Sequence, residues 1–204
     1  MTQPVKQRNF LDHLALWLSV LLSPFVCVPY FCVVFAQATA RSTTEFYQLS
    51  TLCTLLSIGV PAIYIAWHVR KGNITDLHVK EVEQRKGPFR AGRWSMGSLF
   101  LSLWLYGAPQ GLTALAGVLF AQVFIFEWIS RTWKISMHTS VLAACLAGSV
   151  ELAHWSTASL WILLPLCWAR HRRGRHLWSQ TFTGAALGYG LTAGPLRWLL
   201  HSQI

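Results

Sequence analysis

Residues that can bind and transfer a phosphoryl group occur in three separate polar regions of the sequence. The candidates are Lys80, Ser136, His138, Arg170, Arg175 and His176. Cations neutralise the oxygens of a phosphoryl group, and a hydroxyl group donates a hydrogen bond to them. One histidine can then attack phosphorus while the other protonates the leaving oxygen. The set therefore suits phosphoryl chemistry, provided that the fold brings the three regions together.

Carboxylates near these candidates do not form a cluster that could hold Mg²⁺. Asp76, Glu81 and Glu83 all lie in the first polar region, and the other two regions contain no carboxylate. Magnesium sites in proteins are built on carboxylates together with substrate phosphates. We therefore expect a reaction that needs neither a metal ion nor another cofactor.

The composition indicates an integral membrane protein. Of the 204 residues, 53% are hydrophobic and 12% are charged, whereas soluble domains carry about 25% charged residues. Lys and Arg number 17 against 7 Asp and Glu, which gives a net charge of +10. Such an excess indicates cytoplasmic loops, anionic headgroups or a phosphate-bearing ligand. The five cysteines lie in apolar stretches without a C-x-x-C pair, so we expect buried thiols rather than disulfides or a metal site.

Apolar segments recur along the whole chain, near 14–38, 49–69, 94–107, 111–130, 136–152, 156–169 and 178–200. They predict an all-α, polytopic integral membrane bundle of six or seven transmembrane segments, forming a single domain over 1–204. The first run is longer than the apolar region of a signal peptide, which is about 7–15 residues. We expect it to be retained as a transmembrane helix. The one long polar connection is the loop predicted over 70–93.

Basic residues concentrate on one predicted face of this bundle. If every segment crosses the membrane, two crossings separate each of the loops 70–93, 131–135 and 170–177 from the next, so all three share a face with the N-terminus. The opposite face keeps only Arg41 and Arg197. The positive-inside rule makes the basic face cytoplasmic, although cations that bind phosphate would bias the same count.

Three short motifs, taken in order, resemble those of the type 2 phosphatidic acid phosphatase superfamily, which includes lipid phosphatases related to vanadium haloperoxidases. The family patterns are K-x6-R-P, P-S-G-H and S-R-x5-H-x3-D. The corresponding stretches here are KEVEQRKGP at 80–88, ISMH at 135–138 and ARHRRGRHLWSQ at 169–180. Gly184 follows where the family commonly has a glycine. The motifs span about half the chain, so this chain looks like a divergent member.

The resemblance implies a role for each matching residue. His176 would be the nucleophile that forms a phosphohistidine, and His138 would be the general acid and then the base. Lys80 and Arg170 would hold the phosphoryl group, with a hydrogen bond from Ser136 and with Arg175 as a further cation. Gln180 would orient His176.

Five positions depart from the family patterns. Gly87 replaces an arginine, and Arg85 and Arg90 are nearby substitutes, although residues two positions apart on a helix point to different sides. Ile135, Met137 and Ala169 replace a proline, a glycine and a serine, and Gln180 replaces an aspartate. A neutral amide can fix the tautomer of a histidine but cannot stabilise its imidazolium as a carboxylate does.

These features predict a phosphatase acting on a membrane lipid phosphate, either an isoprenoid phosphate or diphosphate or phosphatidate. The alternative is a catalytically weakened subunit that binds a lipid phosphate in an oligomer or a membrane complex. A lipid transporter is a third hypothesis. The lack of an internal repeat, which many transporters have, argues against it. Nucleic acid is not an expected partner, because the basic residues lie at segment ends, where lipid headgroups are.

Overall fold

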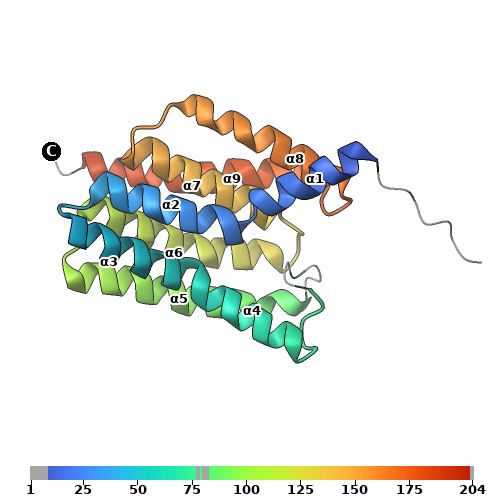
Figure 1. Cartoon of the computed structure of the whole chain (residues 1–204), viewed down its shortest axis with the longest axis horizontal. Coiled ribbons are helices and arrows are strands. Elements are labelled where there is room, and N and C mark those ends of the chain that lie inside the picture. Colours follow the sequence, from blue (N-terminus) through green and yellow to red (C-terminus); the bar gives the residue numbers. More distant parts are fainter. Residues whose placement is uncertain (1–8, 77–78, 80–82, 203–204) are drawn as a thin grey trace, which may run out of the picture.

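Helices run roughly along the long axis of the molecule in the computed structural model (Figure 1). The structure describes residues 9–76, 79 and 83–202, and every regular element in these ranges is helical. The α-helices are α1 (Phe10–Leu21), α2 (Pro24–Thr39), α3 (Thr43–Thr54), α4 (Val60–Arg70), α5 (Lys86–Tyr106), α6 (Gln110–Ser130), α7 (Met137–Leu152), α8 (Leu163–Arg172) and α9 (Trp178–His201). A π-helix, η1 (Leu55–Gly59), joins α3 to α4, and the short 3₁₀-helices η2 (Glu83–Arg85) and η3 (Thr157–Ile162) precede α5 and α8. The predicted all-α class is confirmed for the described residues.

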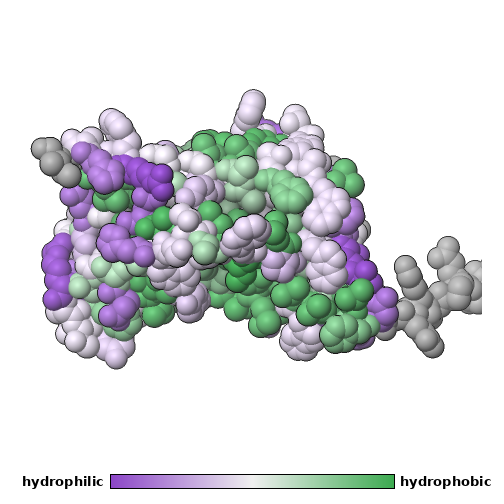
Figure 2. All heavy atoms as spheres, turned by 90° about the horizontal axis from the view of Figure 1, so that it is seen from above, coloured by the Kyte–Doolittle hydropathy of each residue, from purple (hydrophilic) through white to green (hydrophobic). Residues whose placement is uncertain are grey.

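Two helices in the described part of the chain are long and apolar enough to cross a membrane. They are the continuous helix Thr43–Arg70, which contains α3, η1 and α4, and α6. The pair α1 and α2 would be a third span if the two helices cross together. Length and composition thus support two or three spans. Hydrophilic residues gather at the two ends of the face shown in Figure 2, and hydrophobic residues lie between them.

The first apolar run is not one straight helix. α1 and α2 meet at a bend of 46°. Pro24 is the first residue of α2, and a proline disfavours helical geometry in the residue before it, here Ser23. Because the first N–H groups of a helix have no partner within it, a proline is well tolerated at this position. The break therefore follows from the position of Pro24.

The loop predicted over 70–93 ends earlier than expected, because α5 begins at Lys86. Pro88 lies in the first turn of α5, where the missing N–H of a proline costs no hydrogen bond. Gly87 lies against α4: a Cβ atom there would meet the Tyr64 hydroxyl at 2.5 Å. The close approach of α4 explains why a side chain as large as arginine is absent at position 87.

α7 and α9 form the most extensive helix contact of the described residues. Two glycines of α9 permit it. A Cβ atom at Gly184 would meet Thr139 Oγ1 at 2.7 Å and the Ser136 carbonyl at 2.9 Å, and one at Gly188 would clash with the Ser140 carbonyl. The glycine expected at 184 therefore has a packing reason, since only a residue without Cβ fits there.

Candidate active site

The three polar regions meet at one end of the bundle, as the sequence predicted. They all contribute to one central cavity of about 330 Å³. Arg85 immediately precedes α5, His138 is in the first turn of α7, Arg170 is in the last turn of α8, and His176 lies between α8 and α9. All four residues line the cavity, and their exposed fractions lie between 4% and 9%. We call these four residues the cationic end of the cavity.

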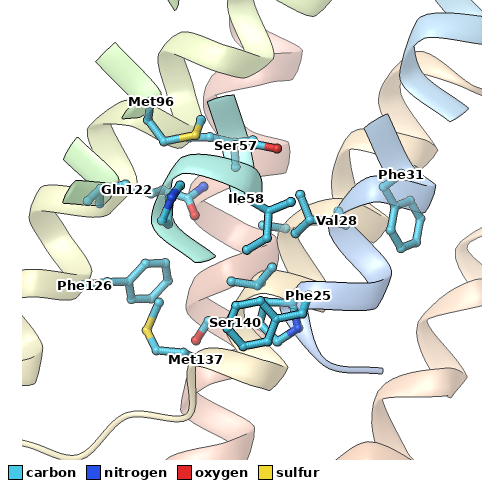
Figure 3. Close-up of a pocket in the computed structure, with 18 of the residues that line it drawn as sticks. Phe25, Val28, Phe31, Ser57, Ile58, Met96, Gln122, Phe126, Met137 and Ser140 are labelled. Atoms are coloured by element: carbon cyan, nitrogen blue, oxygen red, sulfur yellow. The ribbon is translucent and has the colours of Figure 1, made fainter. Parts of the chain in front are cut away.

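The rest of the cavity is mainly apolar. Figure 3 shows side chains of α2, η1, α5, α6 and α7 around a common space, among them Phe25, Val28, Ile58, Met96 and Phe126. Cations and imidazoles thus lie at one end of a cavity whose walls are otherwise hydrocarbon. An arrangement of this kind suits a ligand with a charged head and an apolar body.

Gln180 fixes the orientation of His176. The backbone N–H of Leu177 donates to Gln180 Oε1 over 3.1 Å, which identifies that atom as the amide oxygen. His176 Nδ1 is 3.2 Å from the same oxygen. Because an amide oxygen can only accept, Nδ1 carries the proton and donates it to this bond. The other ring nitrogen, Nε2, therefore holds the lone pair in the neutral ring.

His176 is held in the neutral form that a nucleophile requires. Burial lowers its pKa to about 4, helped by the positive charge of Arg170 and, to a smaller extent, by Lys134 and Arg85, and opposed by the hydrogen bond with Gln180. Desolvation and like charge both disfavour the charged imidazolium. The ring is consequently neutral throughout the physiological pH range.

One guanidinium donor of Arg170, its Nε, is buried without a hydrogen-bond partner among the described residues. The carbonyl of Arg170 accepts from the backbone N–H of Arg175, which closes the turn after α8. Buried guanidinium donors are costly to leave unpaired.

Arg85 supplies a second cation that the motif comparison did not assign. Arg85 is buried and lines the cavity, and its Nε donates to the carbonyl of Val79 over 3.2 Å. The sequence offered Arg85 as a substitute for the arginine missing at 87, but the helix argument spoke against it. In the structure Arg85, the last residue of η2, nevertheless lines the cavity.

Ser136 lies behind the cavity. Its N–H donates to the Gln180 carbonyl over 3.3 Å, and its own carbonyl accepts from Thr139 Oγ1 and Ser140 Oγ. The Ser136 side chain is fully buried and is not among the cavity-lining residues, and its Oγ has no partner within the described residues. Through its N–H, Ser136 links the start of α7, which carries His138, to α9, which carries Gln180.

Arg175, another predicted phosphate ligand, is not among the residues that line the cavity. The predicted ligand Lys80 lies outside the described residues. Arg175 is partly exposed, and its Nη1 is 3.9 Å from Asp76 Oδ2. This pair joins the first polar region to the third. Arg172 similarly ties α8 to α1, with its Nε 3.0 Å from Asp12 Oδ1.

The five cysteines are free and buried, as predicted. Among the described residues, no group of three or more His, Cys, Asp or Glu side chains could hold a metal ion. Comparison with known proteins finds no similarity: no family model, no curated protein and no solved structure matches the chain.

Proposed function

We propose that this protein is a metal-independent phosphatase of membrane lipid phosphates that works through a phosphohistidine. The observation that carries the proposal is the meeting of Arg85, Arg170, His138 and His176, drawn from three distant regions, at one end of an apolar cavity. The motif resemblance supports the same assignment, and we propose that the chain is a divergent member of the type 2 phosphatidic acid phosphatase superfamily.

The proposed reaction has two steps on the same residues. In the first, Nε2 of His176 attacks phosphorus, the bond from phosphorus to the leaving oxygen breaks, and His138 donates a proton to that oxygen. The leaving group is the lipid alcohol of a monophosphate or the lipid monophosphate of a diphosphate. In the second, His138 removes a proton from water, whose oxygen attacks the phosphohistidine. The phosphorus–nitrogen bond then breaks, releasing phosphate and the neutral His176. Arg170 and Arg85 neutralise the phosphoryl oxygens in both steps. Lys80, Arg175 and Ser136 remain proposed further donors to the phosphoryl group.

The proposed setting is a membrane that six or seven segments cross, with the cationic end of the cavity at the cytoplasmic surface. The hydrophobic band between two hydrophilic ends in Figure 2 supports a position within a membrane, and the positive-inside rule supports the cytoplasmic side for the basic end. There the headgroup reaches the cationic end while the hydrocarbon stays among apolar side chains. The substrates that fit are isoprenoid phosphates or diphosphates and phosphatidate.

Phosphate release by the purified protein tests the proposal directly. The protein is incubated without metal with phosphatidate, farnesyl diphosphate and undecaprenyl diphosphate. His176→Ala should abolish turnover and the acid-labile phosphoenzyme. His171→Ala is the matched control, because His171 is exposed and stacks on Trp178 outside the cavity. Equal release by wild type and His176→Ala would refute the phosphohistidine mechanism.

The alternative is a lipid-phosphate-binding subunit without turnover. The observation that favours it is the amide of Gln180, which fixes the tautomer of His176 but cannot offset the positive charge that develops on the attacking ring. If the protein binds the same lipids but releases phosphate from none of them, this second function would be supported.

A further inference from the structure

The lining of the central cavity extends along most of α5. On α5 its lining runs from Pro88, beside the cationic end, to Leu103. At 1.5 Å per residue these positions are about 22 Å apart along the helix axis. A volume of about 330 Å³ is at the small end of the range of about 300–1,000 Å³ found for ligand pockets. A cavity with a volume at the small end of this range favours a ligand with one hydrocarbon chain over a ligand with two.

The few polar groups along this length are already bonded within the protein. Gln122 Nε2 donates to Thr192 Oγ1 over 2.6 Å, Ser140 Oγ donates to the Ser136 carbonyl over 2.9 Å, and Ser57 Oγ is 3.4 Å from Cys32 Sγ. Polar partners for a ligand are therefore concentrated at the cationic end. Beyond it, the cavity offers hydrocarbon contacts.

Large apolar side chains line the deep end. Leu103, Leu112 and Leu115 line the cavity there and are at most 3% exposed. All three are on the half of the bundle away from the cationic end, because α5 runs toward that side and α6 starts from it. A chain whose phosphate lies against Arg85 and Arg170 must end before these leucines.

We propose that the cavity binds the single hydrocarbon chain of a one-chain lipid phosphate, and that Leu103 and its neighbours at the deep end set the chain length accepted. This proposal rests on the proposed function for its phosphate-bearing head. It favours an isoprenoid or other single-chain phosphate over phosphatidate, whose two chains need a larger cavity. Leu103 acts here as a specificity-determining residue and not as a catalytic one.

Binding of single-chain alkyl phosphonates tests the proposal without requiring turnover. Decyl, tetradecyl and octadecyl phosphonates are added to protein in lipid nanodiscs. Occupancy is read as protection of His176 against diethyl pyrocarbonate, quantified by peptide mass spectrometry. His171, which is exposed, serves as the unprotected reference in the same sample. Dipalmitoyl phosphatidate is the two-chain competitor.

Two variants change the length of the cavity in opposite directions. Ala116→Leu fills it near the deep end and should weaken protection by the longest phosphonate about tenfold, corresponding to about 1.4 kcal/mol of steric cost, while the shortest is unaffected. Leu103→Ala should move the optimum toward longer chains. Ala121→Leu and Leu105→Ala are matched controls on the same helices, since both residues are exposed, and neither should alter the profile.

The outcomes separate the two proposals. Length profiles that shift in the lining variants and not in the controls support a chain-measuring cavity, even if no lipid is hydrolysed. Hydrolysis by a protein whose protection is independent of chain length in wild type and variants would overturn the cavity proposal alone. Protection by phosphatidate as strong as that by the best phosphonate would also overturn it. A preference for farnesyl phosphate over an alkyl phosphate of equal length would identify the chain as isoprenoid.

Discussion

At the scale of single residues, Gln180 determines which nitrogen of His176 can react. A carboxylate in its place would accept the same proton from Nδ1 and would also stabilise the charged ring. We therefore expect Gln180→Glu to raise the pKa of His176 above its present value of about 4. Because only the neutral ring can attack in the proposed mechanism, we expect phosphate release to be lost as the pH falls through this pKa. The acid limb of the rate profile should move to higher pH, by roughly one pH unit or more.

The pH profile of phosphate release from farnesyl diphosphate checks this expectation. Gln48→Glu is a suitable control, because Gln48 is exposed and its Oε1 accepts from Tyr106 at the other end of the bundle. It should leave the acid limb in place. An acid limb unmoved in Gln180→Glu would mean that His176 is not the group whose protonation stops the reaction.

Residue types and spacing were sufficient to find His138, His176 and Arg170, because their chemistry is specific and the intervals between them match a motif. They were not sufficient for Arg85. Arg85 lies where η2 ends and α5 begins, and a change of helix type within three residues leaves no periodic signal from which the direction of its side chain could be predicted. The orientation of the Gln180 amide could not be predicted from the sequence either, because the backbone N–H of Leu177 fixes it.

At the scale of elements, the close contact of α7 and α9 positions both histidines. A methyl group at Gly188 would clash with the backbone of Ser140, so one helix would have to move. We expect Gly188→Ala to lower the stability by about 1–3 kcal/mol and to reduce phosphate release, because His138 lies in the first turn of α7. Thermal unfolding in detergent and the rate at a low temperature measure the two effects separately.

Gly190→Ala on the same helix provides the control. No heavy atom of the described residues lies within 4 Å of a Cβ placed there, and alanine is the better helix former by about 0.5–1 kcal/mol. This variant should be as stable as wild type or slightly more stable. Equal unfolding temperatures for the two variants would show that the α7–α9 contact can accommodate an added methyl group without loss of stability.

Apolar segments predicted most helices well, because a helix in an apolar setting needs little beyond length and hydrophobicity. The boundaries that failed were set by contacts distant in sequence or by proline. α5 extends back to Lys86, although 86–93 is polar, since Gly87 packs against Tyr64. The π-helix η1 precedes Pro61, which has no N–H for the carbonyl of Ser57, so the regular ladder is interrupted there.

At the scale of the whole molecule, the distribution of charge predicts which end faces the cytoplasm. The cationic end of the cavity lies among the basic loops, whereas Arg41 and Arg197 at the other end are each paired with a glutamate, Glu45 and Glu151. By the positive-inside rule we expect the first end to be cytoplasmic. The continuous helix Thr43–Arg70 would then cross with its start outside and its end inside.

Single introduced cysteines at the two ends of that helix test the orientation. Thr44 and Lys71 are exposed, and the five native cysteines are buried, so background labelling should be low. In intact cells, a membrane-impermeant maleimide should label Thr44→Cys but not Lys71→Cys, and permeabilised cells should show both. The reverse pattern would place the cationic end outside. The basic residues there would then owe their position to phosphate binding and not to topology, because the positive-inside rule could no longer account for them.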